Sequence, residues 1–194
     1  MVHKKIVIGA TGHRLIINNQ SVMMGIDKAL NRICHEYPGH ELVCYSSIAE
    51  GADRLIAQKV LATPGGQLFA VLPFDTEKYA KDFLSDESKQ EFEIFMEKAV
   101  DVAVMPAANS REDSYLAAGK YVLNKCDVLI AVWDGNPPGG VGGTGQIVNF
   151  AREKKPLAWV HADKRKKEPK YSKNKINKQC IVIFENFPEL TKFQ

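Results

Sequence analysis

Short apolar runs alternate with longer amphipathic segments along most of the chain, and this alternation restricts the fold more than any other feature. The apolar runs are Lys5–Gly9, Glu41–Ser46, Gln67–Leu72, Val100–Pro106, Asp127–Trp133 and Pro156–Val160. Most of them are apolar at consecutive positions rather than at every second one. That pattern is typical of strands covered on both faces, so the runs predict a buried, mainly parallel sheet.

The segments between these runs carry apolar residues at helical spacing, which predicts core-facing helices. The stripes are Val22, Ile26, Ala29 and Ile33; Ala52, Leu55, Ile56 and Val60; Phe92, Phe95, Met96 and Ala99; Tyr115, Ala118, Val122 and Cys126; and, in a shorter helix after Thr144, Ile147, Phe150 and Ala151. Repeated strand–helix units predict an α/β fold, a Rossmann-like three-layer sandwich with a mostly parallel sheet of six or seven strands. Cys180–Phe184 is the candidate seventh strand, an added edge strand of either direction.

Length and composition favour one cytoplasmic domain over residues 1–194. The apolar fraction is 45% and the charged fraction 25%, which is ordinary for a globular chain. No apolar run approaches the roughly 18 residues of a membrane span, so no membrane partner is expected, and the N-terminus does not resemble a signal peptide. The four cysteines lack metal-ligand spacing, which predicts a reducing compartment and no metal site.

Most of the positive charge lies in one segment. Residues 163–178 hold eight Lys or Arg and two acidic residues, a charge of +6, and the chain as a whole carries +3, so the remainder carries −3. Such a block is typical of a solvated loop. It contains a single aromatic residue, Tyr171, to stack on a base, which disfavours nucleic acid as a partner.

Ligands of open parallel sheets bind beyond the carboxyl ends of the strands, and the residues found there are rich in glycine and polar groups. The candidate ligand-binding residues after the first two strands are Gly9, Thr11, Gly12, His13, Arg14, Ser46, Ser47 and Gly51. Those after the later strands are Pro73, Trp133 and Gly135. A plain turn, a helix cap or a core Trp explains several of these residues equally well.

The segment 139–146 is the strongest local signal. Five glycines within the seven residues 139–145 lead directly into the helix that begins near Thr144. Bare backbone amides at the positive end of a helix dipole bind anions, so Gly142, Gly143, Thr144 and Gln146 complete the predicted phosphate site. The spacing fits neither a GxGxxG dinucleotide fingerprint nor a nucleoside-triphosphatase P-loop.

The chain resembles the SLOG superfamily, which includes the Lonely-guy (LOG) phosphoribohydrolases, DNA-processing protein A and ligand-sensing domains. The resemblance runs from about Val7 to Val160, nearly 80% of the chain, and is closest to a sensor-like branch. The matching segments, in chain order, are Thr11–Arg14, Glu50–Arg54, Leu72–Phe74, Ala118–Tyr121, Cys126–Gly135 and Gly142–Thr144.

The resemblance implies a Rossmann-like fold, a nucleotide-derived ligand over the Gly-Gly-Thr loop, no further cofactor, and a homodimer. LOG hydrolases carry a PGGxGTxxE signature whose glutamate helps to cleave the bond between base and ribose 5′-phosphate. Here Ile147 stands at that position and Gln146 at the neighbouring one, and neither side chain can act as a general acid. Glu50, Asp53 and Asp134 are the candidate catalytic residues that follow other strands.

Three functions are therefore compared. A module that binds a nucleotide or nucleotide-like small molecule fits the glycine loop without a neighbouring acid. An N-glycosidase or nucleoside transferase acting on nucleoside 5′-monophosphates would use Arg14 for the phosphate and one of the three carboxylates for acid–base chemistry. A nucleic-acid-binding protein follows only from the analogy with DNA-processing protein A and from the lysine-rich segment.

Overall fold

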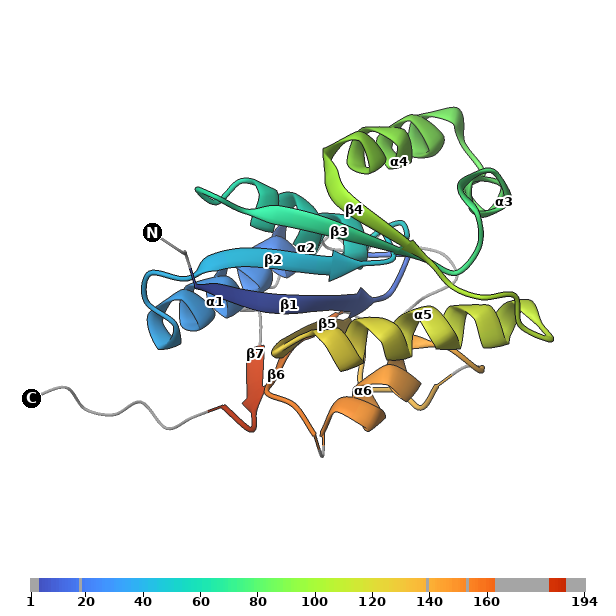
Figure 1. The fold of residues 1–194 in the computed structure, drawn as a ribbon. Coiled ribbons are helices and arrows are strands. Elements are labelled where there is room, and N and C mark those ends of the chain that lie inside the picture. The colour runs from blue at the N-terminus through green and yellow to red at the C-terminus, as the bar shows by residue number, and fades with distance from the viewer. Residues whose placement is uncertain (1–3, 18, 139, 153, 163–181, 188–194) are drawn as a thin grey trace, which may run out of the picture.

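The computed structural model describes residues 4–17, 19–138, 140–152, 154–162 and 182–187. A seven-stranded sheet in the order β4-β3-β2-β1-β5-β6-β7 forms the centre of the molecule, as Figure 1 shows. The strands are β1 (Lys5–Gly12), β2 (Glu41–Ser46), β3 (Gln67–Leu72), β4 (Ala99–Val104), β5 (Val128–Trp133), β6 (Leu157–His161) and β7 (Val182–Glu185). All pairs are parallel except β6 with β7. The predicted Rossmann-like α/β sandwich is confirmed.

Helices cover both faces of this sheet. α1 (Asn19–Glu36) and α2 (Ala52–Leu61) lie on one face, and α5 (Arg111–Lys125) and α6 (Thr144–Arg152) lie on the other (Figure 1). The short α3 (Thr76–Ala80) and α4 (Asp86–Lys98) connect β3 to the edge strand β4. Ser85, Ser110 and Asp75 begin α4, α5 and α3 by accepting a hydrogen bond from a backbone N–H three residues later, as N-cap side chains do.

The predicted stripes face the core. All four stripe residues of α1 are buried, and Ile56 and Val60 of α2 are fully buried under the same face of the sheet. β5 is buried at each of its six positions, because strands of a parallel sheet covered on both faces have no solvent side. The hydrophobic run at residues 128–133 is therefore the centre of the core.

Several boundaries differ from the sequence prediction. β1 continues to Gly12, because Ala10, Thr11 and Gly12 pair with β5 after the pairing with β2 has ended. α3 has no amphipathic stripe long enough to detect, and it was not predicted. The seventh strand exists at residues 182–185 and is antiparallel, whereas residues 180 and 181 and the lysine-rich segment 163–178 lie outside the described residues.

The order of the strands fixes where a ligand can bind. The chain adds β2, β3 and β4 on one side of β1 and then returns to place β5 on the other side, so the order reverses between β1 and β5. Loops that leave neighbouring strands to opposite sides open a crevice at this point. Within the described part of the chain, no helix is both long enough and apolar enough to span a bilayer.

Candidate ligand-binding site

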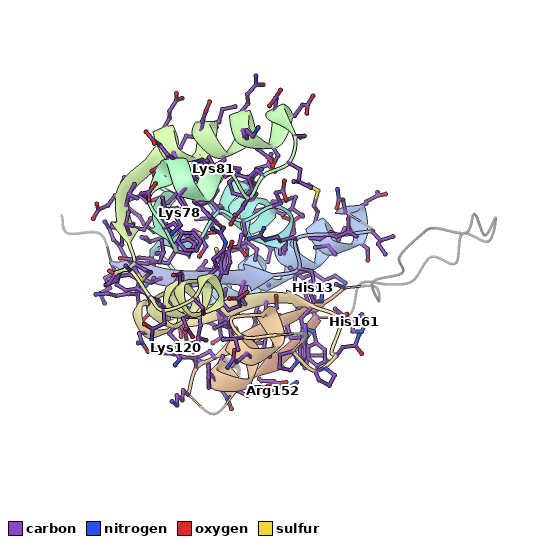
Figure 2. All side chains as sticks on the ribbon, turned by 90° about the vertical axis from the view of Figure 1, so that its right-hand side faces the viewer. His13, Lys78, Lys81, Lys120, Arg152 and His161 are labelled. Atoms are coloured by element: carbon purple, nitrogen blue, oxygen red, sulfur yellow. The ribbon has the colours of Figure 1, made fainter. Side chains whose placement is uncertain are left out.

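A cavity of about 420 Å³ lies at the carboxyl ends of β1, β2 and β5. Figure 2 looks onto this edge of the sheet, with Lys78 and Lys81 above the strands, Lys120 and Arg152 below them, and His13 between. The cavity is lined by Ala10, Thr11, Gly12, His13, Arg14, Leu15, Ser47, Ala49, Asp53, Tyr79, Tyr115, Gly119, Val122, Val141, Gly142, Gly143, Thr144 and Ile147. It lies at the crevice that the strand order opens.

The end of β1 forms one side of the cavity and is held by two neighbouring elements. The His13 N–H donates to the Val132 carbonyl at 3.0 Å, and the His13 carbonyl accepts from the Ala52 N–H at 3.1 Å. Gly51, with φ +78°, makes this approach possible because a Cβ there would lie 2.6 Å from the His13 carbonyl oxygen. The start of α2 is thereby fixed against the segment that presents Arg14.

Asp53 is the carboxylate of the cavity. Its side chain is 6% exposed, and it accepts a hydrogen bond from the Ser46 hydroxyl at 3.4 Å and from the backbone N–H groups of Ser47 and Ala49. Burial raises the pKa of Asp53 to about 7, although the charge of Arg14 and these hydrogen bonds act to lower it. Asp53 can therefore hold or release a proton near neutral pH.

Asp134 lies behind the cavity and is held differently. Its oxygens accept from the side chain of Asn136 at 2.8 Å and from the Asn136 N–H at 3.1 Å. Its Oδ1 lies 3.1 Å from His13 Nε2, and its own backbone N–H points at the same nitrogen. Burial acts to raise the pKa of Asp134, but the Asn136 and His13 hydrogen bonds outweigh burial and lower it. This carboxylate stays ionised and fixes the His13 ring.

The glycine-rich loop and the first turn of α6 form the opposite side of the cavity. Gly142, with φ +79°, packs against the backbone of α5, where a Cβ would lie 2.9 Å from the Leu116 nitrogen. The Gly142 N–H donates to the side-chain oxygen of Gln146 at 2.8 Å. Gln146 therefore holds the glycine-rich loop through its backbone. Gly143 and Thr144 are the residues at the start of α6 that line the cavity.

Two tyrosines form the wall next to α3. Tyr79 is 1% exposed and packs edge-on against Phe92, and burial, followed by the charge of Asp53, raises its pKa. The Tyr115 hydroxyl donates to Asp82, which also accepts from Arg111. The Arg14 guanidinium lies 5.5 Å from the centre of the Tyr115 ring. These contacts place one cation against an aromatic wall at the mouth of the cavity.

The structure brings together about half of the residues that the sequence singled out. Those lining the cavity are Thr11, Gly12, His13, Arg14, Ser47, Asp53, Gly142, Gly143 and Thr144. Those outside the lining are Gly9, Ser46, Glu50, Gly51, Pro73, Trp133, Asp134, Gly135 and Gln146.

Several of the residues outside the lining have a different role that the structure makes clear. Glu50 accepts a hydrogen bond from Ser88 of α4, so it links the turn before α2 to α4 and lies outside the cavity lining. Trp133 packs against Trp159, with ring centres 5.1 Å apart and ring planes tilted by 40°. Ser46 contributes indirectly, since its hydroxyl holds both Asp53 and the Ile48 N–H.

Two aromatic side chains are among the lining residues that sequence reasoning missed. Tyr79 lies on α3, which no pattern revealed, and Tyr115 was assigned only to the core stripe of α5. Sequence reasoning also missed a strained residue, Ile48. This residue is fully buried and has φ 55°, a conformation that β-branched residues rarely adopt. The Ile48 carbonyl accepts a hydrogen bond from Arg54 Nε at 3.2 Å, which ties the loop between β2 and α2 to the α2 helix.

The cavity thus combines bare amides at a helix start, one guanidinium, one proton-carrying carboxyl group and two aromatic rings. Within the described residues, no three His, Cys, Asp or Glu side chains are grouped in a way that would hold a metal ion. No protein-family model matches the chain, and no curated protein matches it either.

Proposed function

We propose that this protein binds a nucleotide or a nucleotide-derived small molecule in the cavity at the carboxyl ends of β1, β2 and β5. The observation that carries the proposal is the pairing of Arg14 with the start of α6 across one cavity. Backbone amides at a helix start and a guanidinium are the two groups that proteins use most readily to hold a phosphate.

The remaining lining suits the rest of such a ligand. A cavity of about 420 Å³ is within the range of small-molecule sites, which runs from roughly 300 to 1,000 Å³. The ring of Tyr115 offers flat apolar surface for a base, and Thr11 and Ser47 offer hydroxyl groups for a ribose. The resemblance to the sensor-like SLOG branch points to the same ligand class, and it adds a homodimer to the proposal.

Calorimetric titration with the 5′-monophosphates of the common nucleosides tests the proposal. We expect at least one of them to bind and Arg14→Gln to weaken that binding about tenfold or more, because a charge-assisted phosphate contact is lost. Lys120→Gln is the matched control: it removes the same charge from exposed α5 surface outside the lining and should leave the affinity unchanged. Absence of binding across the panel, or equal losses in the two variants, would contradict the proposal.

A second candidate function, hydrolysis of the N-glycosidic bond of a nucleoside 5′-monophosphate, is favoured by one observation. Asp53 lines the cavity with its pKa raised to about 7, as a general acid at neutral pH requires. In this reaction the Asp53 carboxyl protonates the departing base and water adds to the anomeric carbon. The proton released by that water returns to Asp53, and the products are free base and ribose 5′-phosphate.

Chromatographic measurement of free base separates the two candidates. Hydrolysis predicts base release by the unchanged protein and loss of at least a hundredfold in Asp53→Asn, which keeps the shape but carries no acidic proton. Glu50→Gln is the matched control, since Glu50 lies outside the cavity and its replacement can still accept from Ser88. Binding of a nucleotide without release of free base would exclude hydrolysis and support the binding function.

A further inference from the structure

Asp82 lies in the segment that connects α3 to α4, and its carboxylate binds two side chains of α5. Its oxygens accept hydrogen bonds from the Tyr115 hydroxyl and from the Arg111 guanidinium. Arg111 also donates to the Tyr115 hydroxyl oxygen, at 3.3 Å. The Asp82 side chain is 13% exposed, so these contacts are largely shielded from water. None of the functions considered above gives Asp82 a role.

Tyr115 binds Asp82 as a neutral hydroxyl group. Burial, followed by the hydrogen bond to Asp82, raises the pKa of Tyr115 above its ordinary value. The hydroxyl therefore keeps its proton at neutral pH, and its hydrogen bond to the carboxylate is charge-assisted. Because the hydroxyl is rigidly attached to the ring, this hydrogen bond also restricts where the ring can lie.

The Tyr115 ring in turn contacts Arg14, and the same residue packs against the loop that leads into α6. The Arg14 guanidinium lies 5.5 Å from the ring centre, an attractive cation–π contact. Tyr115 also packs closely on Gly142, where a Cβ would lie 3.1 Å from the Tyr115 Cβ. Gly142 directly precedes Gly143 and Thr144, the lining residues at the start of α6. The position of Tyr115 therefore influences where Arg14 lies relative to the start of α6.

We infer that Asp82 and Tyr115 are positioning residues for the phosphate of the ligand. Asp82 holds the Tyr115 hydroxyl, and the Tyr115 ring holds the Arg14 guanidinium in place beside the cavity. Arg14 is an exposed, long side chain, and fixing it before the ligand arrives lowers the conformational entropy that binding must remove. This inference rests on the proposed nucleotide-binding function and adds to it two residues that act through Arg14.

A double-mutant cycle between Tyr115 and Arg14 tests the inference. The measurement is calorimetry with a nucleoside 5′-monophosphate that the unchanged protein binds. Tyr115→Phe removes the hydroxyl but keeps the ring and all charges, and we expect it to weaken binding about three- to tenfold. In the Arg14→Gln protein the same change should alter the affinity by less than about twofold, because the group that Tyr115 positions is already gone.

Tyr121→Phe is the matched control for the loss of a hydroxyl group. Tyr121 lies on the same helix as Tyr115 but outside the cavity lining, so its replacement should leave the affinity unchanged.

Asp82→Ala separates positioning from a simple effect of charge. Removal of a negative charge beside Arg14 would, by itself, strengthen the binding of an anion. The change also removes the carboxylate that holds the Tyr115 hydroxyl, so positioning predicts that the affinity for the same monophosphate falls about threefold. In the Arg14→Gln protein this loss should disappear.

Four results would overturn the inference. It is wrong if Tyr115→Phe leaves the affinity unchanged, if Tyr115→Phe weakens binding equally with and without Arg14, if Tyr121→Phe weakens binding as much, or if Asp82→Ala strengthens binding. In each case the unchanged protein still binds its monophosphate, so the proposed function stands. If no nucleoside 5′-monophosphate binds the unchanged protein, the proposed function fails and this inference fails with it.

Discussion

Asp53 and Asp134 occupy comparable places and behave in opposite ways. Each follows a strand that ends at the same edge of the sheet, and each is 6% exposed. Asp53 receives its side-chain hydrogen bond from Ser46 at a long 3.4 Å, and burial raises its pKa. Asp134 receives two hydrogen bonds from Asn136 and faces His13, and its pKa is lowered. Two carboxylates with the same exposed fraction thus behave as one proton-carrying group and one fixed charge.

Asp53 is therefore available to a ligand, whereas Asp134 stabilises the fold. The Asp134 carboxylate accepts hydrogen bonds from Asn136 in the loop after β5 and faces the ring of His13. Asp53 lines an open cavity in which the charge of Arg14 only partly compensates the loss of water. At Asp53 the loss of water outweighs the hydrogen bonds and the charge of Arg14, whereas at Asp134 the hydrogen bonds from Asn136 and His13 outweigh the loss of water.

The largest effect expected from this comparison is on stability. Asp134→Ala removes the carboxylate that faces the buried His13 ring and accepts both hydrogen bonds from Asn136, so we expect the free energy of unfolding to fall by about 3 kcal/mol at pH 7. Urea denaturation measures this change. Asp53→Asn is the comparison variant and should lose far less at that pH. Equal losses in the two variants would contradict the distinction between them.

The next effect is a pH dependence that belongs to Asp53 alone. Its raised pKa means that the folded state binds the proton more tightly than the unfolded state does. The stabilisation is therefore complete below about pH 4 and is lost as the pH rises to about 7. Between pH 5 and pH 8 we expect the unchanged protein to lose about 2 to 3 kcal/mol relative to Asp53→Asn. Parallel pH profiles for the two proteins would show that Asp53 titrates normally.

The smallest effect concerns the donors of Asp134. Asn136→Ala removes the side-chain hydrogen bond at 2.8 Å and keeps the backbone one, so a loss of about 1 kcal/mol in the free energy of unfolding is expected. The Asp134 pKa should also move up toward its ordinary value, which carboxyl carbon NMR can follow. An unchanged titration of Asp134 would mean that His13 and the backbone are sufficient to hold it.

The sequence predicted the layers of this fold better than it predicted the details of the site. Consecutive apolar residues at 128–133 and the α1 stripe have few alternatives to a buried strand and a core helix, and both are found as expected. The sequence did not predict the direction of β7, because the long segment between β6 and β7 permits a parallel or an antiparallel strand. α3 was missed because five residues cannot show a helical period.

The site was predicted as a set of loops, and that part of the prediction locates the cavity. Which side chains face the cavity depends on contacts between distant segments. Glu50 and Asp53 lie three residues apart, yet Ser88 of α4 binds Glu50, whereas Asp53 lines the cavity. Gln146 was expected to meet the ligand; it lies outside the lining, and its side-chain oxygen accepts from the Gly142 N–H. No local pattern encodes such partners.

The most direct test of the central claim is an amide NMR titration with the nucleoside 5′-monophosphates. A phosphate held at the start of α6 accepts from backbone N–H groups, so the account predicts that the Gly143 and Thr144 amide resonances shift with the ligand. The exposed turn at Gly39 precedes β2, at the opposite end of that strand from the cavity, and should not respond. Shifts confined to residues outside the cavity, or no shifts with any nucleotide, would contradict the assignment of this cavity as a nucleotide site.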